Sequence, residues 1–292
     1  MGKIIIRVPA TSANMGPGFD SIGIAFHLYM TVIVEEETEK WRVNHALGSD
    51  VPTDERNLIV QAALKVAPDL KPHQLSVMSD IPVARGLGSS STGIVAGVKI
   101  ADALDDLHLT LAEQVTLATQ MEGHPDNVAP ALLGDVVVAN FDGETATTVK
   151  LTMPELKVLA YIKHDPLLTS DSRDALPKSL PLAQAVKGSS VANVVVAALA
   201  TGDWTLASHM MEHDEFHETV RTKLVPELPI IRETAHKLGI YGTYLSGAGP
   251  TIATFGTEPQ LIILRQKLTD MDMVGSMRIL TIDRQGATVN AE

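Results

Sequence analysis

Short runs of β-branched and apolar residues occur along the chain between longer segments in which apolar or small residues recur every three or four positions. The short runs predict strands, because β-branched side chains favour extended backbone; they cover residues 3–8, 31–34, 75–77, 136–139, 158–162, 251–255 and 277–282. The longer segments predict helices over residues 57–67, 90–104, 111–122, 182–199, 206–211, 228–238 and 261–268. Strands and helices come in groups rather than in strict alternation, so the pattern predicts an α+β fold in preference to a doubly wound parallel sheet.

Turn-forming residues interrupt this pattern near the middle of the chain. Gly143 and Pro154 bracket the interruption, and a loop-rich stretch over residues 164–181 follows it. Such residues are typical of boundaries between structural units. We therefore expect two α+β domains, residues 1–150 and residues 151–292.

Composition narrows the class of protein. The chain has 292 residues, of which 45% are hydrophobic and 20% charged, as in ordinary globular enzymes. A net charge of -12 without a basic cluster argues against nucleic acid as a partner. The absence of cysteine excludes disulfides, thiolate catalysis and cysteine-ligated metals. The longest apolar run, residues 194–200, is well below the roughly 20 residues that span a bilayer. We expect a cytoplasmic protein without a membrane role.

A Gly/Ser-rich segment, PVARGLGSSST at residues 82–92, follows a predicted strand and leads into a helix. Gly86 and Gly88 permit positive φ and leave no side chain to block a ligand, so consecutive backbone N–H groups can face one concavity. The free N–H groups at the start of the helix near Ser90 suit an anion such as phosphate. The segment is neither a Walker A loop nor the dinucleotide fingerprint. An ordinary turn with a serine helix cap has the same composition, so this segment alone leaves both interpretations open.

Two further segments make the pattern specific. PATSANMGPGFD lies at residues 9–20, just after the first predicted strand, and LSGAGPT lies at residues 245–251, just before a late one. With residues 82–92, they resemble the three signature motifs of the galactokinase, homoserine kinase, mevalonate kinase and phosphomevalonate kinase superfamily (GHMP kinases), and the resemblance covers essentially the whole chain.

This resemblance implies a GHMP-kinase-like two-domain fold. Its N-terminal half would be ribosomal-protein-S5-like, with a left-handed β-α-β unit, and its C-terminal half ferredoxin-like, often in homodimers. It also implies ATP as the phosphoryl donor, Mg²⁺ as the metal ion and a small-molecule alcohol as the acceptor.

Two other segments resemble one branch of the superfamily, the homoserine kinases: EGHPDNVAP at residues 122–130 and TSDSRDALP at residues 169–177. The implied reaction is phosphorylation of the homoserine hydroxyl in threonine biosynthesis. One alternative is another kinase of the same superfamily that acts on mevalonate or a sugar. A different class is a binding or sensor protein that keeps the fold without turnover, because fold does not determine function.

An amino-acid alcohol carries an ammonium and a carboxylate, so its site should contain both charges. Asp20 suits the ammonium, and Arg173 and Arg221 suit the carboxylate, because a guanidinium matches two carboxylate oxygens. Taken alone, either arginine would more often be a surface charge. Thr219-Val220 stands where homoserine kinases commonly have proline and an aromatic residue, which weakens the assignment of Arg221. The resemblance adds Asn14, His124 and Asn127 around the substrate, and places Thr169, with Asn14 and Arg173, on the catalytic side.

The metal and nucleotide sites follow from the same motifs. Because Mg²⁺ prefers oxygen ligands, Glu122 and the Ser90 hydroxyl are expected to complete its shell, although Glu122 alone could be a solvated carboxylate and His124 a turn residue. Zinc is disfavoured, since the ten histidines show no paired ligand spacing. The resemblance implies ATP contacts from Asn57 on the adenine side and from Pro82, Arg85, Gly86, Leu87, Gly88, Ser89, Ser90, Ser91 and Thr92. No Asp and Lys pair that would activate the hydroxyl can be placed, so we expect transfer by alignment and charge neutralisation.

Overall fold

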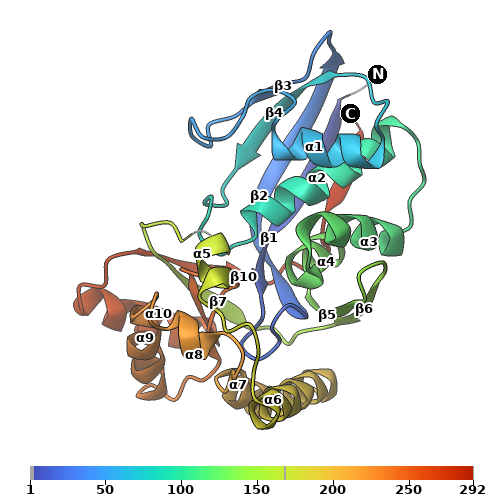
Figure 1. Cartoon of the computed structure of the whole chain (residues 1–292). Coiled ribbons are helices and arrows are strands. Elements are labelled where there is room, and N and C mark those ends of the chain that lie inside the picture. Colours follow the sequence, from blue (N-terminus) through green and yellow to red (C-terminus); the bar gives the residue numbers. More distant parts are fainter. Residues whose placement is uncertain (1–2, 168, 292) are drawn as a thin grey trace.

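The computed structural model describes residues 3–167 and 169–291, without the side chains of residues 169–171. Two sheets with helices packed on them make up the described part of the chain (Figure 1). The strands are β1 (Ile4–Ala13), β2 (Ile22–Glu37), β3 (Arg42–Asn44), β4 (His73–Ser79), β5 (Val136–Phe141), β6 (Ala146–Leu151), β7 (Lys157–Ile162), β8 (Thr243–Leu245), β9 (Ile252–Gly256), β10 (Ser276–Thr281) and β11 (Thr288–Ala291). The helices are α1 (Leu58–Val66), α2 (Ser89–Leu104), α3 (Leu111–Glu122), α4 (Pro125–Leu133), α5 (Thr169–Asp174), α6 (Leu182–Thr201), α7 (Trp204–Met211), α8 (Glu218–Arg221), α9 (Glu227–His236) and α10 (Glu258–Asp270).

The seven-stranded first sheet is built around two long antiparallel strands, β1 and β2. Its order is β11-β1-β2-β4-β3, and β5 pairs with both β2 and β6. The strands β3 and β4 are parallel and α1 lies between them in the chain, so they form the predicted β-α-β unit. The last strand, β11, returns to pair with β1, so the first and last strands lie side by side in this sheet (Figure 1).

The second sheet has the order β10-β7-β9-β8, and all its neighbouring strands are antiparallel. With α9 and α10, its elements follow one another as β7-α9-β8-β9-α10-β10, which is the ferredoxin-like β-α-β-β-α-β arrangement. The helices α5 to α8 are inserted between β7 and α9. The predicted α+β fold is therefore confirmed, while the boundary between residues 150 and 151 stays a prediction.

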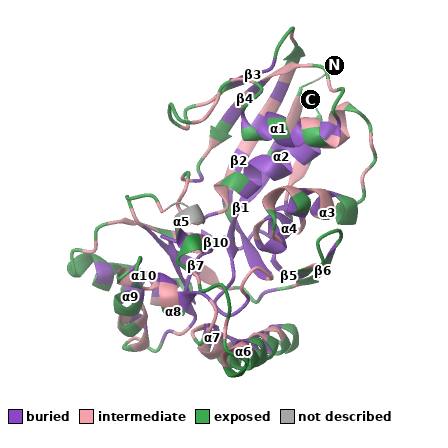
Figure 2. Cartoon of the chain, viewed as in Figure 1, coloured by how far each residue is buried: buried purple, intermediate pink, exposed green. Residues whose placement is uncertain are grey.

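Helix α2 is buried on almost every side, from Ser91 to Ala101 (Figure 2). Its small residues allow this, because a Cβ added to Gly97 would lie 2.5 Å from the carbonyl oxygen of Ile59 on α1. The close packing of α1 on α2 fixes the position of α2 relative to α1. The N-terminus of α2 is the end that carries the Gly/Ser-rich segment.

Several elements differ from the predicted pattern. The stretch over residues 164–181, which we expected to be loop-rich, contains α5, and α4 begins at Pro125 directly after the turn that ends α3. The strand expected at residues 31–34 is the middle of β2, which is 16 residues long because it pairs with β1, β4 and β5 in turn. These differences come from pairing and packing between distant segments, which local residue preferences do not contain.

Candidate active site

A cavity of about 420 Å³ is lined by residues from all three signature segments. Asn14, Phe19 and Asp20 come from the first segment, and Gly247 and Ala248 come from the third. Residues 83, 84, 86 and 88–91 come from the second. The start of α1, the junction of α3 and α4, and the helices α5 and α8 add to the lining, as do β2, β4 and the segment over residues 47–57 before α1. Segments that are more than 200 residues apart in the sequence thus share one site.

The carbonyl groups of the Gly/Ser-rich loop are held by the other two segments. Thr251 Oγ1 donates to the carbonyl oxygen of Arg85, Ser246 Oγ donates to that of Gly86, and the backbone N–H of Thr11 donates to that of Leu87. The backbone N–H groups of residues 86–91 donate no hydrogen bond to any of the described residues. Those donors, at the N-terminus of α2, form the arrangement that binds phosphate.

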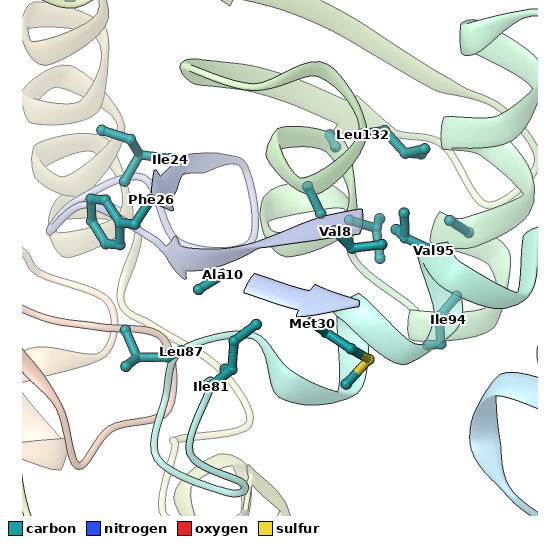
Figure 3. Close-up of a cluster of buried hydrophobic side chains, with 14 of the residues drawn as sticks. Val8, Ala10, Ile24, Phe26, Met30, Ile81, Leu87, Ile94, Val95 and Leu132 are labelled. Carbon is teal, nitrogen blue, oxygen red and sulfur yellow. The ribbon is translucent and has the colours of Figure 1, made fainter. Parts of the chain in front are cut away.

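The two glycines of this loop are required by its geometry. Gly86 and Gly88 have φ of +73° and +68°. A Cβ added to Gly86 would lie 2.6 Å from the carbonyl oxygen of Ser246, and one added to Gly88 would lie 2.1 Å from Thr11 Oγ1. Leu87 between them is buried in the main core, in the same cluster as Ala10 and Ile81 (Figure 3). An ordinary turn would not require the hydrogen bonds that the first and third signature segments donate to this loop.

Glu122, the last residue of α3, is held at the end of the loop. Ser91 Oγ donates a hydrogen bond of 2.8 Å to Glu122 Oε1, and Ser89, Ser90 and Ser91 all line the cavity. A carboxylate and hydroxyl groups beside phosphate-binding N–H groups are a donor set that fits Mg²⁺. Glu122 is therefore not a freely solvated helix-end carboxylate, and Ser91 rather than Ser90 makes the direct contact with it.

The substrate side of the cavity carries charges of both signs. Arg173 forms a bidentate pair with Asp20, with Nη2 at 2.8 Å from Oδ1 and Nη1 at 3.2 Å from Oδ2. Asn14 Oδ1 accepts the backbone N–H of Asp20, and Asn14 Nδ2 donates to the carbonyl oxygen of Gly247. Asn14 thus joins the first and third segments and positions Asp20.

Arg221 is a buried cation with only 2% of its surface exposed, so it is not a surface charge. Its Nε donates to the carbonyl oxygen of Ser172, and its Nη1 donates to that of Gly247 and to Nδ1 of His217. These acceptors are neutral, and among the described residues no carboxylate forms an ion pair with it. Burial, and then repulsion from Arg173, lowers the pKa of Arg221 to about 10, so it stays charged at neutral pH. Asp20, Asp214 and Asp126 act on Arg221 only through their charge, without direct contact. A buried cation with no carboxylate in direct contact can bind an anionic group of a ligand.

His124 lies at the N-cap of α4 and contacts Asp126, with Nδ1 at 2.5 Å from Oδ1. Burial lowers the pKa of His124, but the hydrogen bond and charge of Asp126, with Glu122 and Asp20 nearby, outweigh burial and raise it. Ligand atoms of Asp20, His124 and Asp126 lie within 4.8 Å of one another. His124 is therefore a turn residue that also faces the acidic side of the cavity.

The remaining predicted residues fall into two groups. Asn57 and Asn127 both line the cavity. Asn57 also caps α1, since its Oδ1 accepts a hydrogen bond of 3.0 Å from the N–H of Ile59. Asn127 Oδ1 accepts a hydrogen bond of 2.8 Å from Thr11 Oγ1. Arg85 instead directs its guanidinium to the carbonyl oxygens of Lys163 and His164. Four predicted ATP contacts are not among the lining residues: Pro82, Arg85, Leu87 and Thr92. Thr169 begins α5, but its side chain lies outside the described residues.

The sequence reasoning missed three residues around the substrate side. Phe19 stacks on His217 with 5.4 Å between ring centroids, and the Arg221 guanidinium lies 5.5 Å from the Phe19 ring. Asp126 supports His124. Spacing could have indicated His217, because it precedes Arg221 by four residues, which is one helical turn.

Comparison with known proteins agrees with this geometry. Residues 57–135 match the family model "GHMP kinases N terminal domain", and residues 195–271 match "GHMP kinases C terminal". The homoserine kinase of Lactiplantibacillus plantarum is 53% identical over 98% of this chain and 99% of its own length. A solved structure from Listeria monocytogenes has a TM-score of 0.89 at 41% identity and covers 99% of both chains. The homoserine kinase structure from Cytophaga hutchinsonii has a TM-score of 0.87 at 25% identity and covers 99% of this chain and 98% of that one. The chain belongs to the homoserine kinase family of the GHMP kinases.

Proposed function

We propose that this chain transfers the γ-phosphoryl group of ATP to the hydroxyl of homoserine, in threonine biosynthesis and in the cytoplasm. One observation carries the proposal. A phosphate-binding loop borders a cavity that holds the Asp20 carboxylate and the buried Arg221, which has no carboxylate in direct contact among the described residues. A ligand that combines an ammonium, a carboxylate and a hydroxyl meets both charges beside the loop. The high identity to homoserine kinases supports the same acceptor.

Residues of the first domain, 1–150, bind the nucleotide and its metal ion. The phosphates lie against the N–H groups of residues 86–91 at the start of α2. The adenine lies near Asn57, where apolar side chains of Leu47, Val51 and Ile59 line the cavity. Glu122, Ser90 and Ser91 would hold Mg²⁺, which would supply positive charge against the phosphates.

The second domain, 151–292, supplies the carboxylate anchors and the third motif. Arg221 and Arg173 bind the carboxylate of homoserine, and Asp20 binds its ammonium. In the structure Arg173 and Asp20 compensate each other. A zwitterion can pair with both Arg173 and Asp20 at once, whereas a ligand with one charge leaves one of these half-buried groups without a partner. This favours an amino-acid alcohol over mevalonate or a sugar.

Transfer proceeds by alignment. Among the described residues that line the cavity there is no lysine, which supports a mechanism without an Asp and Lys pair. Asn14, His124 and Asn127 orient the acceptor, and Thr169 is placed near its hydroxyl by the family resemblance. A loose phosphoryl-transfer transition state is stabilised mainly by aligning the acceptor hydroxyl with the γ-phosphate and by positive charge held beside the phosphates.

A substrate screen tests this function. We expect ADP release with Mg²⁺, ATP and homoserine, and much slower release with threonine, mevalonate or galactose as the acceptor. Rapid release with mevalonate or galactose, but not with homoserine, would assign the chain to another branch of the superfamily. No release with any of the four would favour a binding protein without turnover.

We further propose a homodimer formed through α6. This helix is 20 residues long, with a mean hydropathy of 1.4, and by length and composition it is the one helix among the described residues that could cross a membrane. It packs on the core through Val191, Val195 and Leu199, while its outer face stays exposed (Figure 2). The exposed side carries Leu182, Val186 and Val194 with small residues between them and no acidic side chain, and its one lysine, Lys187, is paired with Glu215. In a chain with a net charge of -12, two copies would repel each other least where they meet through this face, because it carries no acidic side chain.

Light scattering after size exclusion tests the dimer. We expect the native chain at twice its mass of 31.2 kDa, and Val186→Lys as a monomer, because a charge would be buried on both sides of a twofold interface. Val149→Lys is the matched control, since Val149 is 58% exposed and Val186 59%. A native monomer, or a Val186→Lys variant that stays dimeric, would contradict this interface.

A further inference from the structure

Three fully buried hydroxyl groups form a chain behind the phosphate loop. Ser12 Oγ on β1 lies 2.8 Å from the hydroxyl of Tyr244 on β8 and 2.7 Å from Ser246 Oγ. Ser246 Oγ in turn donates to the carbonyl oxygen of Gly86. All three residues have 0% of their surface exposed, and none of them lines the cavity.

The direction of these hydrogen bonds follows from counting protons. A carbonyl oxygen can only accept, so the one hydrogen of Ser246 points to Gly86. Ser246 must then accept a hydrogen bond from Ser12. Because the hydrogen of Ser12 is used in that bond, Ser12 must accept a hydrogen bond from Tyr244. Burial raises the pKa of the Tyr244 hydroxyl above its usual value, so Tyr244 keeps the proton that it donates to Ser12.

Holding the Gly86 carbonyl also orients the next N–H group. Because a trans peptide is planar, its C=O and N–H point in opposite directions. The bond from Ser246 to Gly86 therefore turns the N–H of Leu87 away from the third motif. Thr251 acts in the same way on Arg85, and Thr11 on Leu87, which orients the N–H groups of Gly86 and Gly88.

We propose that Tyr244, Ser12 and Ser246 are positioning residues for nucleotide binding, which act through the Gly86 carbonyl without touching the nucleotide. This inference rests on the proposed function only in requiring that a nucleotide binds at the loop. The effect should be largest at Ser246, whose loss leaves a buried carbonyl without a donor. It should be smallest at Tyr244, because Ser12 can still donate to Ser246 without it.

Calorimetric titration with Mg-ADP and steady-state kinetics test this proposal. We expect the dissociation constant for Mg-ADP to rise about tenfold in Ser246→Ala, less in Ser12→Ala, and about twofold to threefold in Tyr244→Phe. The KM for homoserine should change less than about twofold in each. The Ser12→Ala/Ser246→Ala double variant should bind about as well as Ser246→Ala alone, because the two hydroxyls act in series.

Tyr161→Phe and Ser208→Ala are matched controls, since both residues are buried and their hydroxyls donate to the carbonyl oxygens of Val274 and Thr205, which are not part of the loop. They should lower thermal stability without changing nucleotide affinity. Unchanged Mg-ADP affinity in Ser246→Ala, or an equal rise in the KM for homoserine, would overturn the inference. If Ser246→Ala does not fold, Tyr244→Phe decides by the same comparison. A native chain that binds no Mg-ADP would instead overturn the proposed function.

Discussion

Replacing Glu122 by Gln is expected to lower turnover by about a hundredfold to a thousandfold, or roughly 3–4 kcal/mol of transition-state stabilisation at about 1.4 kcal/mol per decade. Glutamine keeps the shape of the side chain and can still accept the hydrogen bond from Ser91. It removes the negative charge that would hold the metal ion beside the phosphates, so the loss should appear in turnover and in the Mg²⁺ concentration for half-maximal rate.

The control for this variant is Glu144→Gln, which changes an exposed carboxylate on the turn between β5 and β6. ADP release as a function of Mg²⁺ should be unchanged in the control. A folded Glu122→Gln enzyme with near-normal turnover and Mg²⁺ dependence would remove Glu122 from the metal site. In that case Ser91 would hold this carboxylate for a structural reason only.

Arg221→Lys is expected to raise the KM for homoserine by between about tenfold and a hundredfold and to leave the KM for ATP nearly unchanged. Lysine keeps the charge but loses the planar fork, and one lost charge-assisted hydrogen bond is worth about 1.5–3 kcal/mol. Turnover should fall as well, since the carboxylate anchor holds the hydroxyl in line with the γ-phosphate. Steady-state kinetics with each substrate varied in turn measures both effects.

Arg221 also holds the carbonyl groups of Ser172 and Gly247, so its replacement should lower thermal stability. Arg232→Lys serves as the control for that loss. Arg232 donates to Glu218 and to the carbonyl oxygen of Thr243, and it does not line the cavity. The control should lose stability without a selective change for homoserine. Unaltered homoserine kinetics in Arg221→Lys would show that this buried cation is structural.

From the sequence alone, the local features of this protein could be predicted. The class of most long helices and strands followed from hydrophobic period, and α3 begins and ends where the pattern placed it, at Leu111 and Glu122. The loop at residues 82–92 could be predicted to bind phosphate because glycine φ and free helix N–H groups are properties of neighbouring residues. The motif resemblance then indicated the family that the comparisons show.

The tertiary structure alone decided which side chains meet. It buried Arg221 despite the departure at Thr219-Val220, brought Ser91 to Glu122, and turned Arg85 away from the cavity that its motif lines. It also joined Ser12 to Ser246, which are 234 residues apart. Such contacts depend on how the two sheets and their loops pack together. Local propensity acts over a few residues and carries no information about that packing, so the sequence determined the loop and its chemistry, and the fold determined its partners.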